Sequence, residues 1–397
     1  SGGWREAARV ASSRGGAVRG EAVSGGAGAS RSAARGACDA CLRRAWLVAR
    51  LAGRIELARH EHARLPEVLA LSDGRLIAAV GGAVAARVAA EYEHFDAAAA
   101  RDAVEAAELV AICRHDERFP SRLLHARDAP AVLHVAGDAR LLEVFAAEEP
   151  AAAIVGMRRA SPYGKDVARA LARDLAAAGV PVVSGMALGV DSAAHAGALD
   201  AGGLTVAVLA GGADVPYPPS KRHLHDEIRR RGLVVSELPP GFRARKWCFP
   251  ARNRIIAGLA DLTIVVEAAE RSGSLITADL AAKLGREVAA APGPITSPGA
   301  AGTNALLRDG ATLVRNARDV LDALFGVGNA PAQARRVGTL EPPLKALLDA
   351  VAHGRDTVAA LAGASADKAD AALVGLTELE LRGLVRREPG GRYAVVP

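Results

Sequence analysis

Ala151-Ala-Ala-Ile-Val155 is an uninterrupted apolar run that ends at Gly156. An amphipathic helix is predicted over Lys165–Ala178, and a second apolar strand follows at Val180–Val183. Continuous apolar runs are typical of strands that are buried on both faces, as in a parallel sheet whose strands are connected by helices. This stretch therefore predicts an α/β fold.

The same alternation continues toward the C-terminus, with helices predicted at about Asp191–Ala201 and at Pro219–Arg231. Glycine or serine follows nearly every strand, at the edge where open α/β sheets bind ligands. The pattern predicts an extended Rossmann-like parallel sheet. The other predicted strands are Ala131–Val135, Leu204–Leu209, Leu233–Val235, Leu262–Val266, Val288–Ala291 and Thr312–Val314.

The chain of 397 residues has room for two or three domains. Residues 1–40 are rich in Gly, Ala, Ser and Arg, which predicts a disordered low-complexity tail. Short helical segments punctuated by glycines predict a small helical domain over 41–115, of the SAM or helix-hairpin-helix kind. The extended Rossmann-like domain is assigned to 116–328.

Residues 329–340 are predicted to be a linker, and residues 341–397 a separate unit. Three helical segments in this unit precede two short strands that flank Pro389-Gly390-Gly391, a pattern typical of a hairpin. Three helices followed by a hairpin predict a winged-helix-like domain. Such a domain can bind DNA or dock a protein, and the sequence does not choose between these roles.

A net charge of +6 permits nucleic-acid binding without proving it. No run of ~18 apolar residues and no signal-peptide pattern is found, so a cytoplasmic protein without a membrane span is expected. Cys38-x-x-Cys41 has metal-ligand spacing, but no second pair follows at zinc-finger spacing. Free thiols are therefore expected, with no metal site and no cofactor.

The strongest candidate for anion binding is Phe249-Pro-Ala-Arg-Asn-Arg-Ile-Ile256. Arg252 and Arg254 flank Asn253, and a guanidinium group matches phosphate oxygens with a planar fork of donors. Two apolar residues follow and connect the segment to the core. This stretch is predicted to grip an anion.

The loops after the predicted strands supply further candidate anion-binding groups. Small residues, Ser184 and Gly185, allow a phosphate to approach the backbone closely. Helix starts are expected to add free amides and a positive dipole end near Gly164 and near Gly273. The remaining candidates at these loops are Arg158, Arg159, Lys221, Ser272 and Ser274.

The sequence shows no nucleophile, base and orienting group in combination. The GxSxG, GxxxxGK[ST] and GxGxxG motifs are absent. His195 is a lone histidine on a predicted helix, which favours a packing role over a catalytic one. Many anion-binding groups without catalytic groups favour binding over catalysis.

Taken together, these motifs resemble the DprA/Smf family of DNA-processing proteins, from about Asp116 to Gly326. Two positions depart from the family pattern. Met157 stands where Ser or Thr is usual, and Leu188 stands where Arg is usual, which removes one cation. The motifs that carry the resemblance are Val183-Ser-Gly-Met-Ala-Leu-Gly-Val-Asp191, Phe249–Ile256, Arg271-Ser-Gly-Ser-Leu-Ile-Thr277, Gly285-Arg-Glu-Val288 and Gly302-Thr-Asn304.

The resemblance implies a protein, not an enzyme, that binds single-stranded DNA in a basic pocket. It further implies that the protein forms a homodimer, protects incoming strands and loads the RecA recombinase during natural transformation of competent cells. Arg159 is added as a candidate substitute for the cation missing at Leu188. Carried over by motif, the pocket residues are Arg158, Ser184, Gly185, Lys221, Arg252, Asn253, Arg254, Ser272, Gly273 and Ser274.

Two alternatives remain open. A nucleotide-processing enzyme of the phosphoribohydrolase kind would need a PGGxGTxxE motif, but here Pro292-Gly-Pro294 and Gly302-Thr303 are separated and no acid stands at the required place. In the other alternative, the C-terminal unit reads DNA and the sheet domain senses a small ligand.

Overall fold

The computed structural model describes residues 36–61, 65–147, 149–329, 342–363, 365–381 and 384–395. Most of the tail predicted for residues 1–40, namely residues 1–35, lies outside the described residues. The linker predicted for 329–340 lies outside them beyond residue 329.

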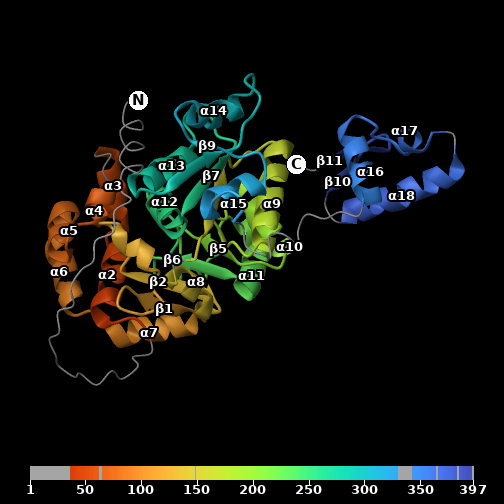
Figure 1. The fold of residues 1–397 in the computed structure, drawn as a ribbon. Coiled ribbons are helices and arrows are strands. Elements are labelled where there is room, and N and C mark those ends of the chain that lie inside the picture. The colour runs from red at the N-terminus through yellow and green to blue at the C-terminus, as the bar shows by residue number, and fades with distance from the viewer. Residues whose placement is uncertain are drawn as a thin grey trace, which may run out of the picture.

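A nine-stranded sheet forms the centre of the molecule, in the order β1-β2-β6-β5-β4-β3-β7-β8-β9 (Figure 1). From β6 to β9 all neighbours are parallel, which confirms the predicted parallel α/β sheet. The strands are β1 (Val110–Cys113), β2 (Val132–Gly137), β3 (Ala152–Gly156), β4 (Val182–Ser184), β5 (Thr205–Val208), β6 (Leu233–Ser236), β7 (Leu262–Val266), β8 (Glu287–Ala290) and β9 (Thr312–Leu313).

The sheet also has an antiparallel edge that the sequence did not predict. β2 pairs antiparallel with both β1 and β6, so β1 runs in the same direction as β6. β1 lies within the segment assigned to the helical domain. Its four residues are too short a run to show a strand period, and only pairing with β2 identifies them.

Helices cover both faces of the parallel strands. Ala153 and Val155 of β3 belong to the core beneath α12 (Cys248–Leu259) and α13 (Gly273–Lys283). Ile154 belongs to the opposite core, because successive side chains of a strand alternate between faces. That second core is closed by α9 (Pro162–Ala177), α10 (Val190–Asp200) and α15 (Ala317–Phe325). The sheet connections also contain α11 (Arg222–Arg231) and α14 (Ala301–Arg308).

The N-terminal helices pack directly against the sheet domain. Leu47 and Leu51 share one buried cluster with Leu238 and Trp247, and Trp247 is fully buried. The Trp247 backbone N–H also donates to Glu56 at 2.7 Å. This unit therefore lacks a core of its own that is separate from the sheet domain. Its helices are α2 (Asp39–Arg50), α3 (Ala52–Glu61), α4 (Leu65–Leu69), α5 (Asp73–Val80), α6 (Ala85–Glu93) and α7 (Ala97–Ala106), and its assignment to the SAM or helix-hairpin-helix kind stays a prediction.

The C-terminal unit has its own small core, which includes Leu344, Leu376 and Tyr393. The hairpin predicted around Pro389-Gly390-Gly391 is confirmed, because β10 and β11 pair antiparallel. Assignment of the unit to the winged-helix class stays a prediction. Its elements are α16 (Pro342–Ala352), α17 (Val358–Ala362), α18 (Ala366–Leu381), β10 (Val385–Glu388) and β11 (Arg392–Val395).

Over the described ranges, none of the helices combines the length and the apolar character that crossing a bilayer requires.

Replacing Trp247 by Ala should destabilise the chain by about 3–5 kcal/mol, because the substitution leaves a cavity between the helical unit and α12. Urea unfolding followed by circular dichroism measures this change. Leu57→Ala is the control: its side chain is exposed on the same helical unit, and its cost should stay within about 0.5 kcal/mol. Equal costs for the two variants would contradict a shared core.

Candidate functional site

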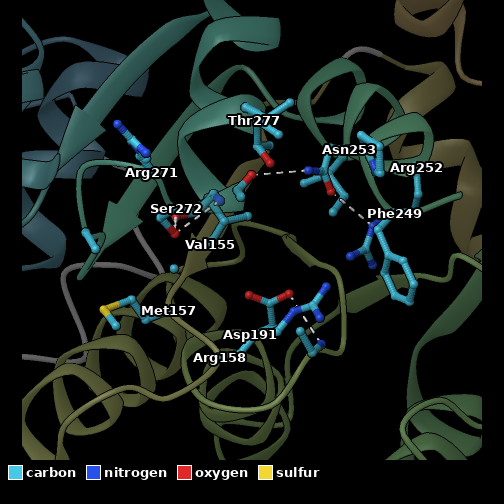
Figure 2. Close-up of a pocket in the computed structure, with 18 of the residues that line it drawn as sticks. Val155, Met157, Arg158, Asp191, Phe249, Arg252, Asn253, Arg271, Ser272 and Thr277 are labelled. Carbon is cyan, nitrogen blue, oxygen red and sulfur yellow. Dashed lines mark hydrogen bonds between the residues drawn. The ribbon is translucent and has the colours of Figure 1, made fainter. Parts of the chain in front are cut away.

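A cavity of about 580 Å³ opens at the carboxyl ends of β3 and β7 (Figure 2). β3 lies between β4 and β7, so the chain builds the sheet outward from β3 in both directions. This is the topological switch point, where open α/β sheets leave a crevice for ligands. The predicted site residues that line the cavity are Arg158, Arg159, Arg252, Asn253, Ser272, Gly273 and Ser274.

Three exposed arginines surround this cavity. Arg158 and Arg159 come from the loop after β3, and Arg271 precedes α13. Among the residues that the structure describes, none of the three forms an ion pair with a carboxylate. The guanidinium carbon of Arg158 lies 5.0 Å from the centre of the Phe249 ring. These three guanidinium groups are thus available to an anionic ligand. Arg271 was not among the predicted site residues, although it directly precedes three of them.

Arg252 is a cation of a different kind, because its side chain is buried. Its Nη1 donates to the carbonyl oxygen of Gly185 at 2.6 Å and also to that of Val208. A Cβ atom at Gly185 would collide with this guanidinium group, so the close approach requires glycine. Burial lowers the pKa of Arg252 to about 10, and the group stays charged at neutral pH. Arg252 therefore fixes the loops after β4 and β5 and adds positive charge to the cavity wall.

Asp191 lies on the same wall, beside Arg158 (Figure 2). Burial raises the pKa of its carboxyl group, and the positive charge of Arg252 opposes that shift. The carboxylate accepts a hydrogen bond from the Ala187 backbone N–H at 3.3 Å. Asp191 thus compensates part of the buried charge of Arg252 and orders the glycine-rich loop after β4.

Four predicted residues do not line the cavity, and two of them, Ser184 and Arg254, are buried away from it. Ser184 is fully buried, and its hydroxyl donates to the Ile154 carbonyl oxygen at 2.6 Å. Arg254 is buried on another side of α12, where it pairs with Glu237 at 2.6 Å and lies within ion-pair distance of Asp128. Neighbours two positions apart on an α-helix project about 200° apart, so Arg252 and Arg254 cannot share a face. The expectation that both arginines grip one anion is corrected.

Gly185 and Lys221 are the other two predicted residues that do not line the main cavity. Gly185 and Leu188 line a smaller adjoining cavity with Tyr217 and Arg158, whereas Lys221 lines neither cavity. Of the two departures from the family pattern, Met157 lies on the wall of the main cavity and Leu188 is exposed at the smaller one.

One helix start faces the cavity, and another that was expected to do so is already capped. At α13, Ser272 accepts from the Ser274 backbone N–H, and a Cβ atom on Gly273 would meet open space. At α9, the backbone N–H of Ser161 donates to Glu267 at 2.8 Å, so a carboxylate already occupies the anion position. The amides of Ser274 and Leu275 have acceptors within the loop, so the α13 terminus offers a ligand the positive end of its dipole, whereas a carboxylate already occupies the α9 terminus.

Aromatic side chains are present at the rim. The Tyr217 and Phe249 rings lie 5.4 Å apart, and Tyr217 is exposed. Tyr163 is also exposed, with its hydroxyl donating to the Pro292 carbonyl oxygen at 3.3 Å. Trp247 is buried in the core and offers no ring surface to a ligand. The rim thus provides ring surface next to the cationic cavity.

His195 is fully buried, as its packing role predicted. Its Nδ1 lies 2.7 Å from Thr205 Oγ1, and burial lowers the pKa of the imidazole to about 3. It is therefore neutral at physiological pH and does not line the cavity.

A family model described as "DNA recombination-mediator protein A" matches residues 110–325. These limits coincide with the first residue of β1 and the last residue of α15, so the match spans the nine-stranded sheet and its helices.

Curated relatives match the same region. The putative DNA processing protein DprA of Mycobacterium tuberculosis is 48% identical over 210 residues, which cover 53% of this chain and 53% of that protein. The DNA processing protein DprA of Streptococcus pneumoniae is 43% identical over 210 residues, covering 52% of this chain and 71% of that protein. The chain thus spans about half the length of the Mycobacterium relative.

Among solved structures, the X-ray structure of DNA processing protein A from Streptococcus pneumoniae is similar, with a TM-score of 0.58 and 33% sequence identity. The alignment covers 72% of this chain and 96% of that one.

Removing the Arg254 side chain tests its structural role. Arg254→Ala should destabilise the fold by about 3–5 kcal/mol, because it leaves the nearly buried carboxylates of Glu237 and Asp128 without a partner. Chemical denaturation of both variants measures the difference. The control is Arg229→Ala, which breaks a more exposed pair with Glu108 and should cost only about 0–1 kcal/mol. A cost for Arg254→Ala no larger than that of the control would refute the assignment.

Proposed function

Because this chain belongs to the family of DNA recombination-mediator protein A, we propose that it binds single-stranded DNA in the cavity at the β3 switch point and loads the RecA recombinase onto it. In this role it protects incoming strands during natural transformation, acts as a homodimer in the cytoplasm and catalyses no reaction. The observation that carries the proposal is the convergence of Arg158, Arg159 and Arg271, all without ion-pair partners among the described residues, on one cavity.

The chemistry of the cavity fits a nucleic-acid backbone. Guanidinium forks bind phosphate oxygens, the positive end of the α13 dipole favours them, and such contacts carry no sequence information. The rings of Tyr217 and Phe249 at the rim supply surfaces on which unpaired bases can stack. Bases are free to stack on protein side chains only when they are not paired, which favours a single strand over a duplex.

The cavity offers little for catalysis. Asp191 is the one carboxylate among its described lining residues, and no histidine, cysteine or lysine lines it. Asp191 is buried and held by the loop backbone. A nucleotide-processing enzyme would need an accessible acid here, and Glu267 near the end of β7 is engaged by Ser161. Binding is therefore favoured over the phosphoribohydrolase alternative.

The test is fluorescence-anisotropy titration of a labelled single strand at several salt concentrations, with duplex as competitor. Replacing Arg158 and Arg271 together by Ala should weaken binding by about tenfold for each lost contact, since a hydrogen bond to a charged group contributes about 1.5–3 kcal/mol. The slope of log affinity against log salt should fall in magnitude by about 1.4, because each phosphate contact contributes about 0.7 on single strands.

The matched control removes the same charge elsewhere. Arg229 and Arg231 lie at the C-terminal end of α11, which leads into the amino end of β6 and so lies at the opposite edge of the sheet. Their double Ala variant should bind DNA like the parent. Equal loss in both double variants would mean that binding reports only total charge. No binding by the parent would redirect the search to nucleotide ligands and turnover of a nucleoside monophosphate.

The C-terminal unit offers a second candidate DNA contact, because Arg386 and Arg387 lie on β10 and Arg392 on β11. Deleting residues 341–397 separates the two sites. Binding that survives the deletion supports the cavity. Binding that disappears, while the cavity variants keep theirs, favours the C-terminal unit as the DNA reader.

A further inference from the structure

Three cysteines and one histidine converge far from the cavity. Cys38 and Cys41 lie at the start of α2, Cys113 is the last residue of β1, and His115 follows two residues later. Their sulfur and nitrogen atoms all lie within 4.8 Å of one another. Cys41 and His115 are 74 positions apart in sequence, so no local spacing pattern predicted that they would meet.

The distances match those of a metal tetrahedron. His115 Nδ1 lies 3.4 Å from the Cys38 sulfur, 3.5 Å from that of Cys41 and 3.9 Å from that of Cys113. Bond lengths of ≈ 2.3 Å to sulfur and ≈ 2.0–2.1 Å to nitrogen place the ligands of tetrahedral zinc about 3.6 Å apart. The side chains are thus already near ligand positions, and only small rotations are needed to enclose an ion.

We propose that Cys38, Cys41, Cys113 and His115 bind one structural Zn²⁺ ion. The expectation of no metal site rested on the absence of a second ligand pair at finger spacing. The fold supplies that pair as Cys113-x-His115, through the packing of α2 against the sheet edge. Three thiolates and one imidazole in a tetrahedron favour zinc over magnesium or calcium, which prefer oxygen ligands.

Positive groups surround the cluster. Cys38 occupies the N-cap position of α2 and Cys41 lies in its first turn, so both residues stand at the positive end of the helix dipole. Three thiolates, a neutral imidazole and Zn²⁺ carry a net charge of −1. Arg114 and Arg127 line the adjoining cavity together with Cys41 and His115, and their positive charges offset that excess.

The site is closed, because four protein ligands fill a tetrahedral shell and leave no position for a substrate. The ion would join the beginning of α2 to the end of β1, and α3 to α7 lie between these two points in the chain. Cys41 and Leu42 already pack with Val132 of β2 in one buried cluster. Zinc would thus clamp the helical unit to the antiparallel edge of the sheet.

The first measurement is metal content by mass spectrometry of the full chain, produced with zinc in the medium and dialysed against a weak chelator. One zinc per chain is expected. His115→Ala is the most informative variant, because His115 is exposed and its loss should leave the core intact. Zinc affinity should fall by at least about tenfold, since even the loss of a group that supports a ligand costs 10–100-fold. The control is Cys248→Ala, which removes the cysteine outside the cluster and should retain one zinc.

Cobalt substitution tests the site in the parent protein, so the proposal can still be judged if a variant fails to fold. The parent protein loaded with Co²⁺ should show the intense visible bands of a tetrahedral thiolate site, and Zn²⁺ should displace them. Removing the ion with a strong chelator should lower the melting temperature of the parent but not that of the Cys113→Ser variant. A parent chain that binds no metal, or whose mass is lower by two hydrogen atoms because Cys38 and Cys41 form a disulfide, would overturn the proposal. Zinc retained equally by His115→Ala would also overturn it.

Discussion

The buried guanidinium of Arg252 is the interaction on which the carboxyl edge of the sheet depends. It extends from α12 and donates to the carbonyl oxygens of Gly185 and Val208. Gly185 directly follows β4, and Val208 is the last residue of β5. Such a charge is costly to bury, and here two carbonyl oxygens and the nearby Asp191 carboxylate compensate it. Position 185 in the loop after β4 must then be glycine, because the guanidinium occupies the space that a side chain there would take.

This constraint separates two roles, supporting the framework and binding a ligand, that the sequence analysis assigned together to the arginine-rich motif. Arg252 and Arg254 are both removed from solvent and hold the framework, one through backbone carbonyls and one through Glu237 and Asp128. The cations that remain available to a ligand lie on loops, at Arg158, Arg159 and Arg271. Helices and strands thus position the cavity, while its exposed cations come from the loops that connect strand to helix.

Most strands of the parallel sheet were predictable because they are largely apolar runs, as buried parallel strands require. The roles of the individual arginines were not predictable in the same way, because the sequence analysis did not assign a helix to the segment that forms α12. Pro250 stands in its first turn, where proline is tolerated, so the proline does not exclude a helix there. Once 248–259 is helical, the spacing of Arg252 and Arg254 alone places them on different faces. The partners of Arg254 lie far away in sequence, at positions 128 and 237. Cys113 likewise meets Cys41 only because β1 pairs with β2 at the side of the sheet. Contacts between residues so far apart in sequence leave no local pattern.

The helical unit contacts the sheet domain at two places. Both lie toward the carboxyl ends of the parallel strands, where the cavity is. β1 runs in the same direction as β6, so the cysteine cluster at its end lies on the edge that also carries the cavity, with β2, β6, β5 and β4 between them. At the second place, Trp247 is buried among the N-terminal helices and immediately precedes α12. Since Arg252 follows Trp247 by little more than one helical turn, the packing of the helical unit fixes the entry of α12 and thereby the position of the guanidinium. The N-terminal helices therefore contribute to the geometry of the cavity without lining it.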